Sequence, residues 1–327
     1  MRYHDDRHAT CRLCPRDCGV PRLQGGVPGY CGETGELRIA AASLHRGEEP
    51  PVTGAGGSGT IFITGCNLGC VFCQNYRISR EGAGAVVSGD EFARICLALE
   101  ERGAENINIV TGSHAVPAIV MGIRLACSRG LSLPVFWNSS AYENPAALSL
   151  LEDTVDVYLP DLKTLDSELS RRFFNAPDYP EHAERAILRM LEVRGKLRYA
   201  PARGTDGSEN RVLVSGVIIR HLVLPERLEA TREVLRWFAE KGRGRALFSL
   251  MTQYTPVTAA PSGGLPGRCI NEAEYEKALR WLEEFEIEDG FYQEPVHDTD
   301  WLPDFEQENP FSSDLSLPVW HWKQGFI

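Results

Sequence analysis

The sequence has no hydrophobic run that is long enough to cross a membrane. No stretch approaches the roughly 18 consecutive apolar residues that a spanning helix needs. The first ten residues, MRYHDDRHAT, are polar and contain no apolar core of the kind found in secretory signals. We therefore expect a cytoplasmic protein without a membrane partner.

The chain also has fewer positively charged residues than negatively charged ones. The chain has 34 Lys and Arg against 45 Asp and Glu, which gives a formal net charge of −11. Such an acidic surface favours solubility and argues against a general nucleic-acid partner. The 327 residues, 43% of them hydrophobic, are enough for one large core or two smaller ones.

Disulfides are not expected either, although the chain has ten cysteines. Thiols stay reduced in the cytosol, and clustered thiols in a reducing compartment usually hold metal. Two groups contain seven of the ten: a quartet of Cys11, Cys14, Cys18 and Cys31, and a triad of Cys66, Cys70 and Cys73. Of the others, Cys96 and Cys127 lie in apolar helical patterns and are expected to be buried.

After residue 60, short apolar runs alternate with helical patterns. The runs lie at 60–64, 107–111, 134–138, 155–159, 216–224 and 246–251, and they are typical of strands buried on both faces. Amphipathic helices are predicted at 90–102 behind an Asp90 cap, at 226–241, and from 272 behind a capping box of Asn271 and Glu274. Repeated strand–helix units indicate a parallel sheet with right-handed crossovers, either open or curled into a barrel.

The triad has no fourth cysteine beside it. It begins two residues after the run at 60–64, which places it at the carboxyl edge of the sheet, where parallel α/β proteins carry their sites. A structural zinc site and a ferredoxin-type cubane both normally have four ligands. Three thiolates fit three irons of a [4Fe–4S] cluster and leave one iron open for a substrate or a second cofactor.

The triad, written Cys66-x3-Cys70-x2-Cys73 with Phe72 before the last thiol, resembles the signature of radical S-adenosylmethionine (SAM) enzymes. Other segments, in the same order, are similar to pyruvate formate-lyase activating enzymes. VDVYLPDLKTLD resembles their D-x-K-x-x-D segment, and IIRHLVLP resembles their R-x-V-V-V-P strand. INIVTGSHA and VFWNSSAYE stand where that family has Gly-Gly-Glu and Thr-Asn-Gly, so the likeness extends over residues 60–250.

Pattern and resemblance together predict an α/β fold with a partial (β/α)6 barrel of the TIM type. The barrel is expected at 60–295. A small cysteine-rich metal-binding segment should precede it at 1–59, and an aromatic tail at 296–327 should pack on it.

The resemblance implies that Cys66, Cys70 and Cys73 ligate a [4Fe–4S] cluster whose open iron binds SAM. The reduced cluster then cleaves SAM to a 5′-deoxyadenosyl radical, which abstracts hydrogen from a substrate. Phe72 should lie near the adenine. The SAM site should be lined by Gly112, Asn138, Asp161, Lys163 and Arg220. Adjacent strand residues point to opposite faces, so one of Arg220 and His221 should face the interior, and the resemblance implies that it is Arg220.

Several alternatives stay open. The quartet suits either a structural Zn²⁺ or a second [4Fe–4S] cluster. The substrate is either a protein, as in the activation of a glycyl-radical enzyme, or a small molecule. An oxidoreductase of this kind needs an electron donor such as flavodoxin or ferredoxin. The rival interpretation is a non-catalytic Fe–S electron-transfer or metal-binding protein.

Overall fold

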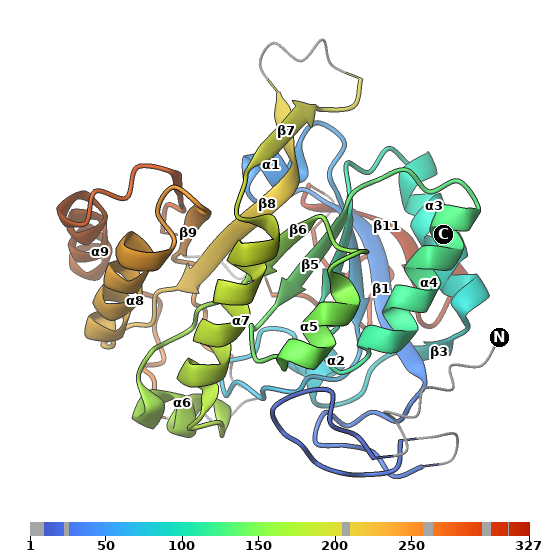
Figure 1. The fold of residues 1–327 in the computed structure, drawn as a ribbon, viewed down its shortest axis with the longest axis horizontal. Coiled ribbons are helices and arrows are strands. Elements are labelled where there is room, and N and C mark those ends of the chain that lie inside the picture. The colour runs from blue at the N-terminus through green and yellow to red at the C-terminus, as the bar shows by residue number, and fades with distance from the viewer. Residues whose placement is uncertain (1–9, 23–25, 205–209, 258–263, 296–301, 313) are drawn as a thin grey trace.

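A computed structural model describes residues 10–22, 26–204, 210–257, 264–295, 302–312 and 314–327. Parallel strands form one side of its sheet, from the edge strand β10 inwards, in the order β10-β9-β8-β6-β5-β4-β2 (Figure 1). They are β2 (Ser58–Ile63), β4 (Ile107–Val110), β5 (Val135–Ser139), β6 (Val157–Pro160), β8 (Arg211–Leu222), β9 (Leu247–Met251) and β10 (Gly290–Tyr292). All six strands expected from the sequence are present within a few residues of their predicted bounds.

Antiparallel strands extend the sheet beyond β2. The order continues through β1 (Leu37–His45) and β11 (Ser316–His321) to β12 (Gly325–Phe326). Two short strands pair off this path, β3 (Ala85–Val87) with β1 and β7 (Arg198–Pro201) with β8. The sheet is not closed, so the fold is a partial barrel in the α/β class, as predicted.

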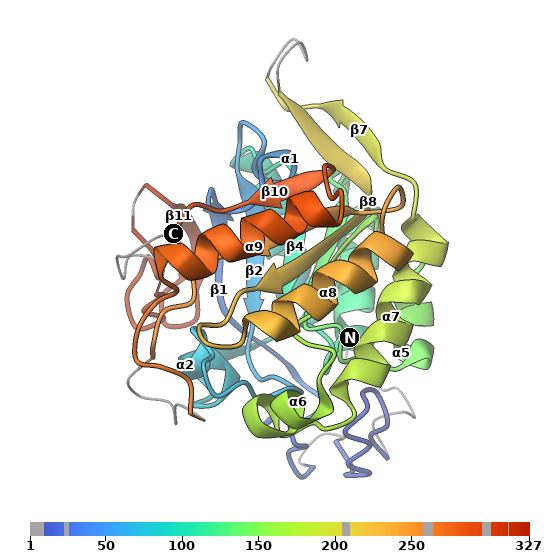
Figure 2. The ribbon, with the colours of Figure 1, turned by 90° about the vertical axis from the view of Figure 1, so that its left-hand side faces the viewer.

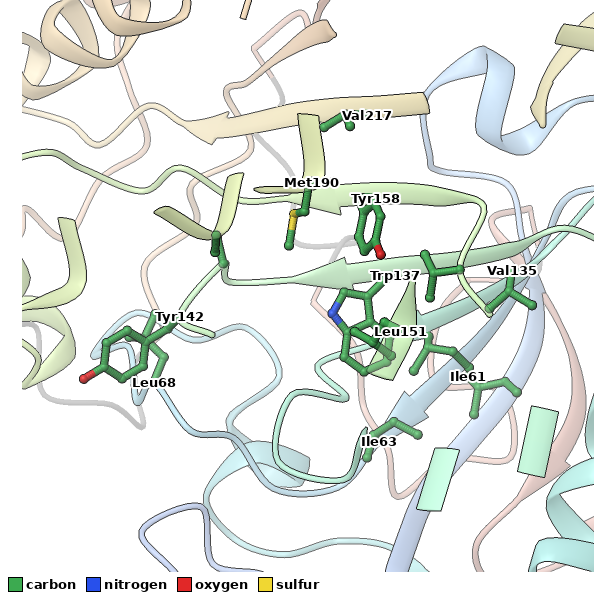
Figure 3. Packing of buried hydrophobic residues seen from close by; sticks show 14 of the residues in the cluster. Ile61, Ile63, Leu68, Val135, Trp137, Tyr142, Leu151, Tyr158, Met190 and Val217 are labelled. Carbon is green, nitrogen blue, oxygen red and sulfur yellow. The ribbon is translucent and has the colours of Figure 1, made fainter. Parts of the chain in front are cut away.

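Helices cover the outer face of the parallel strands, with α5 and α7 in front of the sheet and α4 beside α3 in Figure 1, and α8 beside α9 in Figure 2. Their bounds are α1 (Pro50–Thr53), α2 (Tyr76–Ser79), α3 (Gly89–Glu101), α4 (Val116–Ser128), α5 (Pro145–Leu151), α6 (Ser167–Phe174), α7 (Tyr179–Arg194), α8 (Leu228–Lys241) and α9 (Glu272–Glu284). Between sheet and helices lies the main core, where Trp137 and Tyr158 are almost completely buried (Figure 3). No helix in these described ranges is both long and apolar enough to span a membrane.

Two details of the helices correct the sequence predictions. The N-cap of α3 is Ser88, whose side chain accepts a hydrogen bond from the Glu91 N–H, so the predicted Asp90 cap is wrong. Asp90 instead lies in the first turn and pairs with Arg129. Cys96 is buried as expected, but Cys127 near the end of α4 is exposed. The capping box of Asn271 and Glu274 on α9 is confirmed.

The two ends of the chain contribute to the sheet. β1 lies within the segment expected to bind metal, and it pairs with β2 on one side and β11 on the other. In the tail, Phe305 is fully buried against Phe62 of β2, with ring centroids 5.3 Å apart, whereas Trp301 lies outside the described residues. The division of the chain into three domains stays a prediction.

Candidate active site

The carboxyl ends of the parallel strands surround a cavity of about 420 Å³. Its lining includes all three triad thiols, which follow β2, polar side chains from β5, β8 and β9, and those of Asp161 and Lys163 just after β6. Within the described part of the chain, Cys66, Cys70 and Cys73 are the only cysteines among these lining residues. The triad thus meets the other strand ends at one place, as the sequence predicted.

Backbone hydrogen bonds hold the triad loop. The Val71 N–H donates to the Phe173 carbonyl of α6 at 2.9 Å, and the Cys66 N–H donates to the Cys31 carbonyl at 3.3 Å. Gly65 and Gly69 have φ of 88° and 93°, in the left-handed region that favours glycine. A side chain at Gly65 would also collide with Glu33, because a Cβ there would lie 2.4 Å from the Glu33 Cγ.

The three thiols are half-buried and lie among polar groups. The Leu68 N–H points at the Cys66 sulfur from 3.4 Å, and the Cys73 sulfur lies 3.3 Å from the Ser79 hydroxyl. Burial raises the pKa of the Cys70 thiol to about 12, while the positive charge of Lys163 opposes that shift. A metal would replace the proton on such a thiol.

The donor set of the triad fits a [4Fe–4S] cluster that keeps one iron open. Nowhere in the described ranges are three or more Cys, His, Asp or Glu side chains gathered closely enough to hold a single metal ion as they stand. A cubane takes one thiolate on each ligated iron, so its ligands surround a volume and do not converge on one point. Three thiols and no fourth, on the wall of a cavity, match that requirement.

Lys163 and Asp161 form an ion pair on the cavity wall. The Lys163 Nζ lies 2.6 Å from the Asp161 Oδ2, and both side chains are largely buried. Burial alone would lower the pKa of Lys163, but the charge of Asp161 outweighs it and raises the pKa above its usual value. The lysine therefore carries a positive charge at the wall that also holds the triad.

Tyr179 fixes this segment, a role that nothing in the sequence indicated. Its hydroxyl donates to the Asp161 carbonyl at 2.7 Å and accepts from the Lys163 N–H at 2.9 Å. Tyr179 is fully buried at the start of α7, and only the tertiary structure brings it to the end of β6.

Arg220 lines the cavity, but its charge is already paired. Its guanidinium binds both oxygens of Glu49 and donates to Glu48 at 2.7 Å. Burial would lower its pKa, but the two carboxylates raise it well above the usual value. His221 points away from the cavity, with its ring between the Leu162 carbonyl and the Thr231 hydroxyl.

Sequence reasoning missed Glu48 and Glu49. They stand in HRGEEP before α1, and no spacing within that stretch links them to β8. With Arg220 they form a cluster of one cation and two carboxylates at the wall. Their presence leaves Arg220 less available to an anionic ligand than its type alone suggested.

Of the other residues expected near SAM, two line the cavity and one does not. Asn138 and Phe72 line the cavity, and the Phe72 ring packs edge-on against Phe174 and Tyr254 at 5.9 and 6.0 Å. Gly112 is buried beside Trp137, where an added Cβ would lie 2.6 Å from the indole, and it is not among the lining residues. Thr111, one residue earlier, lines the cavity instead.

The four cysteines of the quartet lie near the start of the described chain, beside the triad loop. Cys11, Cys14 and Cys31 are buried, and a Cβ at Gly29 would lie within 3.5 Å of both the Cys18 and the Cys31 sulfurs. Burial raises the pKa of Cys14 to about 12 and that of Cys31 to about 11.

A buried cation accompanies these thiols. Arg22 is 2% exposed, and its Nη1 points at the Cys11 sulfur from 3.6 Å. Such a charge stabilises thiolates. The choice between zinc and a second cluster stays a prediction.

Comparison with known proteins gives an independent test of the family. Residues 60–199 match the model of the radical SAM superfamily. The chain is 29% identical over 286 residues to the uncharacterized protein MJ0674 of Methanocaldococcus jannaschii, across 85% of this chain and 76% of that protein.

The fold has similar counterparts among solved structures. A radical SAM methyltransferase from Sphaerobacter thermophilus superposes with a TM-score of 0.50 and 14% identity, over 72% of this chain and 66% of that one. SuiB of Streptococcus suis, bound to S-adenosylmethionine, gives a TM-score of 0.49 and 15% identity over 70% of this chain. This chain spans about half the length of SuiB, 48%.

The fold, the three-thiol cavity and the family match agree. The matched region begins within β2, just ahead of the triad, and includes Asn138 and the Asp161–Lys163 pair. Residues 60–199 form a radical SAM domain.

Proposed function

We propose that this radical SAM enzyme cleaves S-adenosylmethionine reductively and uses the product radical to remove hydrogen from a substrate. The observation that carries the proposal is the set of three thiols, without a fourth, on the wall of a cavity that also contains Lys163 and Asn138. A [4Fe–4S] cluster on Cys66, Cys70 and Cys73 supplies an electron and an open iron for SAM when bound.

The chain's own residues bind and orient the cofactor. Lys163 offers a compact positive charge to the SAM carboxylate, because its ammonium has three N–H donors and the hydrogen bond to Asp161 uses one of them. The backbone hydrogen bonds at Asp161 and Lys163 fix the position of that charge, because Tyr179 holds both residues. Phe72 presents an aromatic ring to the adenine, and the buried strand ends exclude water from the radical.

For the substrate we propose two classes, a protein and a small molecule. The D-x-K segment, similar to that of pyruvate formate-lyase activating enzymes, supports a protein substrate such as a glycyl-radical enzyme. The cavity itself, about 420 Å³ and lined by both polar and apolar groups, lies in the size range of small-molecule sites, which supports a small-molecule substrate as the second possibility. Flavodoxin or ferredoxin in the cytoplasm would supply the electron, and the quartet would hold either zinc or a second [4Fe–4S] cluster.

The test is the formation of 5′-deoxyadenosine. Anaerobically reconstituted protein is reduced with dithionite, SAM is added, and the product is quantified by chromatography. We expect product from the wild type and none from the variant with Cys66, Cys70 and Cys73 replaced by Ala. Cys127→Ser is the matched control, because Cys127 is exposed and distant in sequence from both groups. A reduced cluster that never cleaves SAM would instead favour a non-catalytic electron-transfer protein.

A further inference from the structure

Arg16 joins the quartet to the triad loop. It lies between Cys14 and Cys18 in the sequence CPRDC. Its guanidinium donates to the carbonyl oxygens of Asn67 and Leu68, at 2.8 and 2.5 Å. Those two residues lie between Cys66 and Cys70, so Arg16 binds the backbone of the loop that would hold the cluster.

The same guanidinium also binds the end of α6. It donates to the Phe174 carbonyl at 2.9 Å and to the Asn175 carbonyl at 2.5 Å. The last carbonyls of a helix have no partner within the helix, and they attract a cation. The Tyr30 ring covers the guanidinium at 3.8 Å, which restricts its rotation. Arg16 therefore connects three segments through four carbonyl oxygens.

Two further contacts tie the quartet to the triad loop. The Cys66 N–H donates to the Cys31 carbonyl, which links one member of each group through the backbone. The side-chain amide of Asn67, in the triad loop, donates to the Tyr142 carbonyl at 2.7 Å, and this side chain also lowers the pKa of the Cys14 thiol against the larger effect of burial. Both groups of cysteines therefore meet at the triad loop.

We propose that Arg16 is a positioning residue. When the backbone of the N-terminal cysteine site is fixed, Arg16 also fixes the backbone of the triad loop. Metal binding at Cys14 and Cys18 would fix the backbone on both sides of Arg16. The fixed guanidinium then holds the carbonyls of residues 67 and 68, and with them the spacing of Cys66 and Cys70. This inference rests on the proposed metal occupancy of the quartet, but it concerns the loop and not the cleavage of SAM.

The test measures hydrogen exchange of the amides at 64–75 in the reconstituted full chain, without SAM. In Arg16→Ala we expect exchange in this peptide to be roughly tenfold to a hundredfold faster, because charge-assisted hydrogen bonds are lost. Peptides from α3 and β4 should keep their wild-type rates. Arg16→Lys retains the charge but has fewer donors, so it should restore part of the protection.

Arg12→Ala is the matched control. Arg12 belongs to the same segment but is exposed and pairs only locally with Asp17, at 2.9 Å. The Arg12→Ala change should leave the amide hydrogen exchange of residues 64–75 unchanged. Wild-type exchange in Arg16→Ala, or acceleration spread equally over α3 and β4, would each overturn the proposal, the second because it would show general unfolding and not local positioning.

A double-mutant cycle tests the coupling itself. Cys14→Ser with Cys18→Ser should speed exchange at 64–75, and adding Arg16→Ala should speed it little further, because both changes break the same connection. Fully additive effects would show that Arg16 and the quartet act independently, which contradicts the proposal. The 5′-deoxyadenosine assay is run separately, so a failure to cleave SAM would be distinguishable from a failure of this coupling.

Discussion

Arg220 and Glu49 form a two-point ion pair across 171 positions of the sequence. The Arg220 Nε lies 2.9 Å from one Glu49 oxygen, and Nη2 binds the other. Both side chains are less than a tenth exposed. The pair therefore fastens the segment before α1 to β8 at the wall of the cavity.

We expect Arg220→Ala to destabilise the protein strongly. The change leaves Glu48 and Glu49 without their cation, and breaking a buried pair from one side costs about 3–5 kcal/mol. Denaturant unfolding followed by circular dichroism measures the loss. Arg243→Ala is the control, since its pair with Glu286 is exposed and should contribute about 1 kcal/mol or less. Equal effects of the two variants would contradict the structural role given to Arg220.

Lys163→Ala should weaken SAM binding without removing iron. The variant loses the charge-assisted hydrogen bond that we propose between Lys163 and the SAM carboxylate, worth about 1.5–3 kcal/mol, which corresponds to roughly tenfold to a hundredfold in affinity. Titration of SAM into the reduced protein, followed by electron paramagnetic resonance of the cluster, measures Kd. Lys277→Ala is the control, because Lys277 pairs with Glu229 on the surface. Wild-type affinity in Lys163→Ala would remove this lysine from the SAM site.

His221 should make stability fall in mild acid. Burial lowers its pKa to about 4. Below the ordinary pKa of about 6.5 the unfolded chain gains a proton that the folded chain does not, so stability is present above that value and is lost as the pH falls. The loss should be about 2 kcal/mol between pH 7 and pH 5.

The pH slope is checked with His221→Asn, which retains a donor towards the Leu162 carbonyl. Unfolding free energies of both proteins are measured across this pH range. The variant should be less stable at pH 7 and its stability should depend less on pH. Parallel curves for the two proteins would show that His221 does not contribute to the acid sensitivity.

Replacement of Cys11, Cys14, Cys18 and Cys31 by Ser should identify the metal of the quartet. A zinc site would lose one equivalent of zinc while the iron content immediately after reconstitution stays constant. A second cubane would lose about half the iron. Metal analysis of anaerobically prepared protein distinguishes these results, and unchanged content of both metals would show that the quartet binds neither.

Six of the parallel strands could be predicted because each is a short apolar run between helical patterns, whereas β10, a strand of three residues (GFY), was missed. INIVT, for example, gives β4 within one residue. β1 escaped prediction because LRIAAASLH contains three alanines and follows a region without periodicity. Its position in the sheet depends on pairing with β11, which lies near the other end of the sequence.

At the site, the order of the motifs was enough to place Asn138, Lys163 and Arg220 around one cavity. The sequence did not show what these groups bind in the folded protein. Glu49, Tyr179 and Arg16 each act through contacts with segments distant along the chain, and a local pattern contains no information about such contacts. Ser88 was missed for a simpler reason, since serine and aspartate two positions apart are both good N-caps.

The pairing of β1 with β11 has a consequence for synthesis. Roughly 270 residues separate the two strands, and at about 5–20 residues per second their translation takes tens of seconds. During that interval the outer edge of β1 has no β11 to pair with, and an unpaired edge invites association with other chains. The triad and every strand that lines the cavity leave the ribosome before β11 does, so the nascent chain contains the complete cluster loop while one side of its sheet is still exposed.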